Sequence, residues 1–500
     1  MNTAYANTLE FSFFSEASLK FNILLKALGH KEFASSEHGE VEQHIYNQGF
    51  EILRCLFQGY LDKISKTEVI QPSVLNINNQ RLSNRRKGSS RKLTTLFGEV
   101  TVSRISYSSP AKKSFFPLDN QLNLAQRKFS DGVQHRVTVE ASKGSFDDAI
   151  EAMNDTTAAS IAKRQSLQIV QDTAKDFDAY YEQNRYIKEE DTTDLLVISG
   201  DGKGIVMRPD SLRECTKRKV LKGRKIGSRL SQGEKKDRKR MAQVASVYTV
   251  LPHIRVAESI MQSPTEKDEN IKQFRPVARN KRVWASVEKE SKDVIKESFL
   301  EALQRDPKQK RQWVVVVDGQ PSQLIAINKI MQELNVNATI IMDFIHVLEY
   351  LWSAAWCFFK KGSQDAEKWV ANQSLKVLRG KAAQVAKGMR IKATKNKVKS
   401  RLSVDKCAKY LLKNKSRLAY DKALEQGFPI ASGIIEGACR HLINDRLDIT
   451  GARWGLDGAE AILKLRSIRS SGDFDSYWTF HKQQEKLRNY CPNKLENSPN

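Results

Sequence analysis

Hydrophobic and polar positions in the middle of the chain follow strand-like and helix-like spacing in turn. Two short runs rich in Val and Ile, LLVIS and WVVVV, have the length and composition of strands buried on both faces, and they precede Asp201 and Asp318. Residues 241–251 (MAQVASVYTVL) and 338–342 (ATIIM) predict two further strands, whereas VWASVEKESKDVIKESFLEAL predicts a helix. The run after Asp318 has apolar residues at helical spacing, so its strand leads into a crossover helix. This alternation predicts an α/β core.

The pattern of the N-terminal part is different. Residues 41–64 have near-helical apolar spacing and predict an amphipathic helix, and two alternating runs around Phe97-Gly98 predict a β-hairpin. Between positions 145 and 182, two helical patterns are separated by turn residues. They predict either a helix-turn-helix, whose second helix presents Lys163 and Arg164 to a major groove, or two packed helices of a small bundle. The pattern does not separate these two interpretations.

The charge balance of the chain points to a polyanionic partner. The sequence has 83 Lys and Arg against 58 Asp and Glu, a formal net charge of +25, and such a surplus favours DNA as the partner. No apolar run approaches the roughly 18 residues of a membrane span, and we recognise neither a lipidation signal nor a secretory leader. We therefore expect no membrane partner and a cytoplasmic location. Six Cys are scattered without a C-x-x-C pair, which indicates reduced thiols.

One segment concentrates this positive charge. The stretch between Ser211 and Met241 is dense in Lys and Arg and adjoins Asp201 in sequence. A solvated loop or a localisation tract has the same composition. A site that cleaves DNA nevertheless needs cations to hold the strand beside it, through contacts that carry affinity without reading sequence. We therefore expect DNA contacts from five residues at the end of the segment: Lys235, Lys236, Arg238, Lys239 and Arg240.

Three acidic residues predict a metal site. Asp201 and Asp318 follow buried strands, and Glu436 lies much later in ASGIIEGACRHLIND. Asp-Gly after a strand is also a common turn signal, but neither pair is followed by a second alternating strand at hairpin distance. Carboxylates at the carboxyl ends of strands line the crevice of an open α/β sheet, and oxygen ligands select Mg²⁺ or Mn²⁺. Two such ions, roughly 3.5–4 Å apart, can clamp an in-line phosphoryl displacement. The order of the elements is that of a ribonuclease H-like core.

Two further motifs lie near these acids. Glu436, Arg440 and Asn444 are spaced i, i+4 and i+8, so we expect an acid, a DNA-binding cation and an amide on one helix face. Asp343 and His346 are spaced i and i+3 at a helix start and share a face. We expect Asp343 to support the site and His346 to position the DNA strand or a metal-bound water. The alternative is that Asp343 is a helix N-cap and His346 a packed core residue.

Several ordered motifs together resemble bacterial DDE transposases of the ISKra insertion-sequence family, which is related to the Mutator-like group. They are DGKGIVMRPDSLRE, GEKKDRKRMAQVASVY, VVVVDGQ, DFIH with LEYLW, SGIIEGACRHLINDRLDITGARW and GAEAILKLRSIRSSGDFDSYW. The similarity extends from about Asp194 to Trp478, and more loosely through RKLTTLFGEVTVSR. It implies that Asp201, Asp318 and Glu436 are the DDE triad and that Asp343 and His346 match the family's D/C-x-x-H element. Such proteins often carry a cysteine zinc ribbon after the N-terminal hairpin, but YSSPAKKSFFP contains no cysteine.

The resemblance implies metal-dependent cleavage at insertion-sequence ends and strand transfer into target DNA, with two Mg²⁺ (or Mn²⁺) ions per site. The partners would be the terminal repeats and target DNA, bound by a homodimer or higher oligomer in the nucleoid of a bacterium. A structure-specific nuclease on the same fold and a domesticated, non-catalytic DNA-binding protein are the alternatives. The expected organisation is an unassigned segment (1–40), a mainly α DNA-binding region with a β-hairpin (41–190), an α/β ribonuclease H-like catalytic core (191–346 and 428–480), an all-α insertion (347–427) and a tail (481–500).

Overall fold

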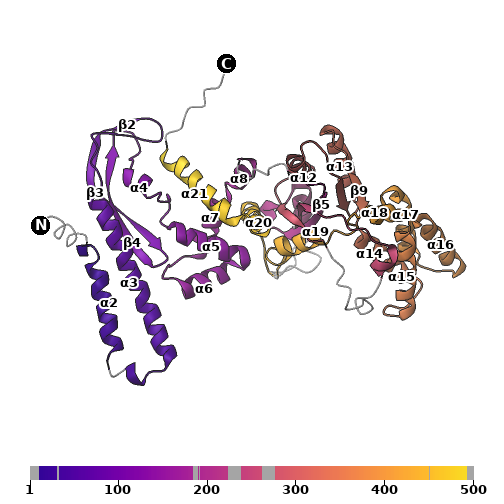
Figure 1. Ribbon diagram of the computed structural model, residues 1–500, viewed down its shortest axis with the longest axis horizontal. Coiled ribbons are helices and arrows are strands. Elements are labelled where there is room, and N and C mark those ends of the chain that lie inside the picture. The colour runs from indigo at the N-terminus through magenta and orange to yellow at the C-terminus, as the bar shows by residue number, and fades with distance from the viewer. Residues whose placement is uncertain are drawn as a thin grey trace, which may run out of the picture. The chain divides into compact units, whose positions relative to one another are not determined.

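The structure is a computed structural model in which two compact units are described separately. One unit comprises residues 1–184 with 474–500, and the other comprises residues 185–473. Helices and strands are labelled in Figure 1. Among the described residues, no helix combines the length and apolar character that crossing a membrane requires. The described residues are 11–30, 33–183, 190, 192–222, 238–261, 276–449 and 451–491.

The first unit begins with a pair of helices. Helix α2 (Ser15–Leu28) lies within residues 1–40, for which the sequence pattern predicts no element, and it packs on α3 (His38–Lys66). The expected hairpin is confirmed, because β3 (Asn84–Thr95) pairs antiparallel with β4 (Gly98–Ser108). The short strands β1 (Val74–Leu75) and β2 (Arg81–Leu82) also pair. The core under the hairpin is formed by residues from α3, β3, β4 and α4 (Pro117–Gln121): Leu61, Leu93, Val100, Val102 and Leu118.

Three helices form a second cluster in this unit. Helices α5 (Asp131–Lys143), α6 (Phe146–Thr156) and α7 (Lys163–Ala174) contact one another around a shared apolar core. The second helix of the expected pair is shorter than predicted, because α7 ends at Ala174 and a separate helix, α8 (Phe177–Gln183), follows. Six residues separate α6 from α7, more than the 3–4 typical of the DNA-binding motif.

The C-terminal helix belongs to this first unit. We expected residues 428–480 in the catalytic core and a tail after them, whereas α21 (Phe474–Tyr490) is one helix grouped with the N-terminal unit. Its buried His481 lies 2.6 Å from Asp176, and the Tyr477 hydroxyl donates to the carbonyl of Thr173. These contacts to the α7–α8 region explain why the segment is an ordered helix rather than a tail.

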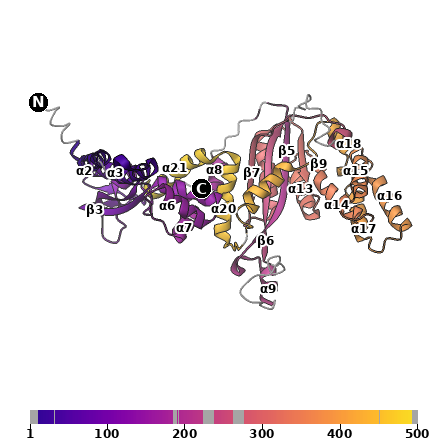
Figure 2. The ribbon, with the colours of Figure 1, turned by 90° about the horizontal axis from the view of Figure 1, so that it is seen from below.

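The second unit is built on a five-stranded mixed sheet with the order β7-β6-β5-β8-β9. Strand β6 is antiparallel to β5 and β7, and β5, β8 and β9 run parallel. The expected helix at VWASVEK is wrong at its start, because residues up to Ser286 form a strand and α12 begins at Ser291. Figure 2 shows the strands from a second direction. Their bounds are β5 Leu195–Val206, β6 Lys239–Val250, β7 Arg279–Ser286, β8 Trp313–Val317 and β9 Thr339–Met342.

Helices cover both faces of the sheet. On one face of β5, a Cβ at Gly200 would meet the Gln323 side chain of α13 (Pro321–Glu333). On the other face, Asp201 contacts Cys439, which follows α19 (Gly433–Ala438). The long apolar helix α20 (Leu456–Ser471) packs on β7. The core therefore lies between the sheet and these helices, as in other α/β domains.

The segment between β9 and α19 is helical, as its pattern predicted. Its first helix, α14 (Phe344–Ala355), begins directly after β9, slightly before the expected insertion boundary. A run of further helices follows before the chain returns to the sheet. They are α15 (Gln364–Leu378), α16 (Ala382–Lys395), α17 (Leu402–Lys413) and α18 (Tyr420–Glu425).

Candidate active site

The strand that carries Asp201 does not stop at this residue. We expected Asp201 at a strand tip, but β5 continues to Val206 because β6 pairs with it along its whole length. The parallel neighbour β8 is shorter, and the last pair between the two strands is Ser199 with Val316. Asp201 therefore lies where β8 has ended, at an edge of the sheet that is open on one side.

The register brings Asp318 to the same level. Asp318 follows the last residue of β8, and it lies two residues beyond Val316, as Asp201 lies two residues beyond Ser199. The next residue, Gly319, has φ +88°, and a Cβ there would lie 2.7 Å from the Met342 sulfur. Only glycine adopts this conformation readily. The glycine thus allows the chain to turn from Asp318 into α13.

The Asp201 carboxylate connects β5 to the segment after Glu436. One oxygen accepts a hydrogen bond from the Gly202 amide at 2.6 Å, and the other accepts from the Cys439 thiol at 3.3 Å. Burial, followed by the charge of Asp201, raises the pKa of Cys439, so the thiol stays protonated and donates. The sequence indicates only that Cys439 is one of six reduced thiols, so it does not predict this contact.

Glu436 lies three residues before Cys439, in the first turn of α19. Burial raises the pKa of Glu436, as do the charges of Asp343, Glu349 and Asp201, while His346 opposes the rise. Glu436 therefore experiences several negative charges, and these favour its neutral form in the absence of a cation. A divalent cation would relieve this repulsion.

The face expected from Glu436, Arg440 and Asn444 is not formed. Residues Cys439–Asn444 form a π-helix, so the four-residue spacing of an α-helix is interrupted immediately after α19. The Arg440 side chain is 75 % exposed and pairs with Asp445 at 3.8 Å, whereas the Asn444 side-chain oxygen is buried without a hydrogen-bond partner in the described structure. π-Bulges are rare and frequently occur at functional sites.

Asp343 is a buried helix cap that joins two elements of the site. One of its oxygens accepts from the Ile345 amide at 2.8 Å, which caps α14. The other accepts from the hydroxyl and amide of Ser432, the residue before α19. The N-cap interpretation of Asp343 is thus confirmed. The same contacts hold the starts of α14 and α19 together.

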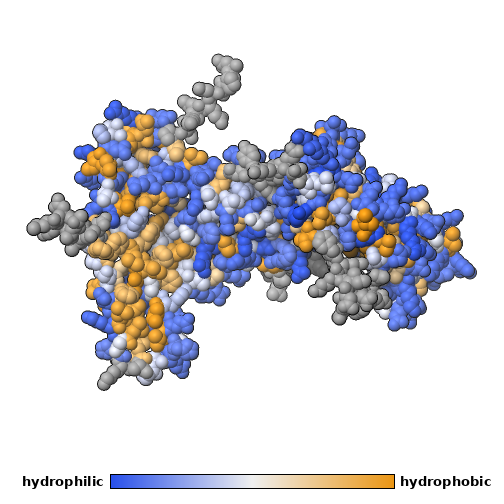
Figure 3. Space-filling model, in the orientation of Figure 1, coloured by the Kyte–Doolittle hydropathy of each residue, from blue (hydrophilic) through white to orange (hydrophobic). Residues whose placement is uncertain are grey.

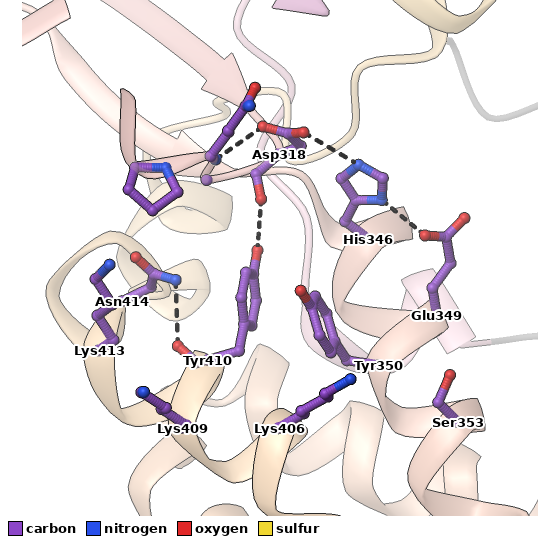
Figure 4. Close-up of a pocket in the computed structure, with 13 residues that line it drawn as sticks. Asp318, His346, Glu349, Tyr350, Ser353, Lys406, Lys409, Tyr410, Lys413 and Asn414 are labelled. Atoms are coloured by element: carbon purple, nitrogen blue, oxygen red, sulfur yellow. Dashed lines mark hydrogen bonds and ion pairs between the residues drawn. The ribbon is translucent and has the colours of Figure 1, made fainter. Parts of the chain in front are cut away.

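His346 is not a core residue. Its side chain is 38 % exposed, its Nε2 lies 3.7 Å from an Asp318 oxygen and its Nδ1 lies 2.8 Å from Glu349 (Figure 4). Asp318 contributes most to raising the pKa of His346 to about 9; burial opposes the rise and Glu349 adds to it. Burial alone raises the pKa of Asp318, but contacts from His346 and the Gln320 amide outweigh it, and the net shift is downward. At neutral pH the site therefore contains an imidazolium between two carboxylates.

Two residues of this site were missed by sequence reasoning. The Tyr410 hydroxyl, from α17, donates to the Asp318 carbonyl at 3.0 Å. The Tyr410 ring stacks on the Tyr350 ring of α14, with centroids 4.3 Å apart and an interplanar angle of 20°. The connection joins residues that are far apart in sequence, and no local motif indicates it.

The expected DNA-binding residues have different environments. Lys163 and Arg164 are exposed at the start of α7, as predicted, although Lys163 pairs with Asp147. Arg238 is partly exposed. Lys235 and Lys236, which were also expected to bind DNA, lie outside the described residues.

The last two residues of the set have contacts within the protein. Lys239 pairs with Asp448 at 3.0 Å. Arg240 donates to the carbonyls of Val287 at 2.8 Å and Ser211 at 3.3 Å, and burial lowers its pKa. The geometry of Arg240 is that of a structural residue.

The three expected metal ligands do not form one tight cluster in the described structure. Within the described ranges, groups of at least three potential ligands with atoms within 4.8 Å of one another are Glu16, Glu51 and Cys55, and Asp176, His481 and Glu485. The expected triad is not among them, so these carboxylates do not surround a single point. Two ions roughly 3.5–4 Å apart distribute their ligands over a wider space. Carboxylate oxygens are the ligands that Mg²⁺ and Mn²⁺ prefer.

Comparison with known proteins finds a family match for part of the chain. Residues 38–238 match the model of an uncharacterised protein family, UPF0236. A comparison with curated proteins found no match. The chain is thus similar to UPF0236 over a stretch that contains Asp201 and ends before Asp318 and Glu436.

Proposed function

We propose that the protein is a DDE transposase, which cleaves DNA at the ends of an insertion sequence and joins them to target DNA. The observation that carries the proposal is the register of β5 and β8, because it places Asp201 and Asp318 at the same level of neighbouring parallel strands. A third acid, Glu436, lies in the electrostatic field of Asp201. Carboxylates brought close together from distant segments repel one another, and a bound cation would reduce this repulsion.

The topology supports a ribonuclease H-like core. Three consecutive strands, β5, β6 and β7, form an antiparallel meander, and β8 and β9 add to the other side of β5 in parallel. This is the strand order that such a core has, with the first acid on its first strand and the second after its fourth. The helical insertion lies between the fifth strand and the helix of the third acid.

The residues have distinct roles in this proposal. Asp201, Asp318 and Glu436 would hold Mg²⁺, which when bound supplies the charge that activates water and stabilises the phosphoryl transition state. His346 lies 3.7 Å from Asp318, where it could position the DNA strand or a metal-bound water. Asp343 holds α14 and α19 at their starts, which positions His346 and Glu436.

Self-association is also part of the proposal. Helix α2 has exposed apolar side chains on two flanks, Leu19 and Ile23 on one and Phe21 and Leu25 on the other. The partner helix α3 exposes further apolar residues, and Figure 3 shows hydrophobic colour over this helix pair. Large exposed apolar surfaces mark interaction sites. Two such helix pairs packed face to face form a four-helix bundle with isologous symmetry. We therefore propose that a second copy of this chain binds the apolar surface of α2 and α3.

An in vitro assay with the DNA that flanks the gene tests the proposed function. Purified protein, Mg²⁺ and a labelled fragment carrying the element ends should give nicks at the ends and products joined to a target plasmid. Asp318→Asn should give neither product while retaining DNA affinity. Cleavage without joining would favour a structure-specific nuclease, and DNA binding without either reaction would favour a non-catalytic protein.

A further inference from the structure

A cleft beside Asp318 is lined in part by residues to which the proposed chemistry gives no role. It has a volume of about 640 Å³ and lies between the start of α13, helix α14 and helix α17. Asp318 and His346 lie at one side, and three lysines of α17 lie at the other (Figure 4). These are Lys406, Lys409 and Lys413, here called the α17 lysine row.

The lysine row occupies one face of its helix. At about 100° per residue, positions 406, 409 and 413 fall within an arc of about 60°, whereas the buried residues Val404, Cys407, Ala408 and Leu411 occupy the other side. All three lysines are exposed, and none forms an ion pair with a described residue. A row of lysines is often only a solvated face. This one lines a cleft, and its other wall contains the candidate active site.

The lysine row is held in a fixed place relative to Asp318. Tyr410 lies between Lys409 and Lys413 on α17, and its hydroxyl donates to the Asp318 carbonyl. Its ring also stacks on Tyr350 of α14, which lines the same cleft. A strand bound by the lysines would therefore be held at a defined distance from Asp318.

The acids of the cleft do not cancel this positive charge. Glu349 and Asp318 both pair with His346 and not with a lysine of the row. The lysine row thus remains available for an anion. From Lys406 to Lys413 the helix rises roughly 10 Å, and phosphates follow one another about every 3.4 Å along the axis of a strand. The row therefore spans about three phosphate-to-phosphate steps.

We propose that this cleft binds one strand of DNA next to the phosphate that is cleaved, with Lys406, Lys409 and Lys413 contacting the backbone. The proposal rests on the proposed function, since it names the path of the substrate strand into that site. It assigns a substrate-positioning role to the helical insertion. The contacts are to phosphates, so they hold the strand without reading its sequence.

Salt-dependent binding by the full chain tests the proposal. The probe is a labelled single-stranded oligonucleotide, and the variant combines Lys406→Gln, Lys409→Gln and Lys413→Gln. The slope of log affinity against log salt should become shallower by about 0.7 for each lost contact on a single strand, thus by about 2 for all three. The matched control removes three exposed lysines outside the cleft without ion pairs to described residues: Lys368→Gln, Lys376→Gln and Lys387→Gln.

The outcomes separate this proposal from the proposed function. A smaller slope in the cleft variant than in the control supports the strand path, and equal slopes in the two variants overturn it. Each single cleft variant should show about a third of the effect, which excludes a general loss of folding. Asp318→Asn should keep the wild-type slope while losing cleavage. If Asp318→Asn still cleaves DNA, the proposed function fails, whereas the slope comparison still decides the strand path.

Discussion

Asp201 and Asp318 occupy equivalent positions on two neighbouring parallel strands, each two residues beyond the paired residues Ser199 and Val316. This arrangement results from unequal strand lengths. Strand β8 has five residues and ends before Asp318, whereas β5 has twelve and continues past Asp201 along β6. Asp201 therefore has a strand neighbour on one side and the open end of β8 on the other. The site forms because the long strand β5 lies beside the short strand β8, so that both acids lie where β8 ends.

The third acid can be identified by comparing two glutamates. We expect Glu436→Gln to lower the cleavage rate by about 10⁴-fold or more, as for a member of a cooperative catalytic unit. Glu349→Gln should cost only about 10–100-fold, because Glu349 orients His346 from outside. Single-turnover cleavage with Mg²⁺ measures both rates. If Glu349→Gln has the larger loss, Glu349 is the third acid.

His346 is expected to affect the rate more than the stability. His346→Ala should slow cleavage by about 10²–10⁴-fold, the range of a positioned acid–base group. It should lower the melting temperature much less than the loss of a core side chain does, because the His346 side chain is 38 % exposed. The neighbouring Val347 is fully buried and serves as the control. Val347→Ala should lower the melting temperature but keep the rate per folded molecule; a His346→Ala variant with that behaviour would contradict the assignment.

The same histidine predicts a pH dependence of stability in the metal-free protein. The pKa of His346 rises from 6.5 in the unfolded chain to about 9 in the folded protein. Its contribution to the free energy of unfolding is therefore fully present below pH 6.5 and is lost as the pH rises through 9. Melting of wild type and His346→Gln from pH 6 to 10 in a chelator tests this. The difference should shrink toward high pH; a difference that grows would refute the ion-pair geometry.

Much of the second unit could be predicted from apolar runs. The strands before Asp201 and Asp318 were recognised because buried parallel strands consist of short Val- and Ile-rich segments. Strand β7 was not, because its VWAS run continues into a helical pattern. What makes it a strand is pairing with β6, for instance Trp284 with Ala245, and such pairing is not visible in local periodicity.

The candidate site could be predicted only in part. Asp201 and Asp318 could be identified because each follows a short apolar run, and Asp343 and His346 by their spacing, whereas Glu436 lies in a helix and follows no strand. The π-helix after α19 changed the expected positions of Arg440 and Asn444, because a change in backbone hydrogen bonding leaves no trace in the residue pattern. The Tyr410 contact depends on folding of the helical insertion against β8. Long-range contacts of this kind require the tertiary structure.

Arg240 and Arg238 are expected to respond differently to loss of charge. Arg240 donates to backbone carbonyls, so Arg240→Met should lower the free energy of unfolding by about 1–3 kcal/mol through acceptors left without partners. Its effect on the salt slope of DNA binding should be small. Arg238 has no side-chain partner among the described residues, and Arg238→Gln should lower the slope by about 0.9 on duplex DNA without loss of stability. Denaturation measures the free energy of unfolding of both variants, and salt titrations measure the slope of DNA binding. Loss of slope in Arg240→Met and loss of stability in Arg238→Gln would contradict the contacts of Arg240.

The exposed apolar residues of α2 predict that two copies of the chain associate through this helix. Leu19 and Ile23 are 59 % and 53 % exposed, so a charge at either position costs the isolated chain little but would be buried without a partner in a dimer. We expect the combined Leu19→Glu and Ile23→Glu variant to be monomeric at concentrations where the wild type is dimeric, by sedimentation velocity. The control introduces the same charges at the exposed polar positions Ser18 and Asn22 of the same helix. Both variants should keep the wild-type helical circular dichroism. A wild type that stays monomeric at all concentrations would show that the α2 surface does not bind a second copy.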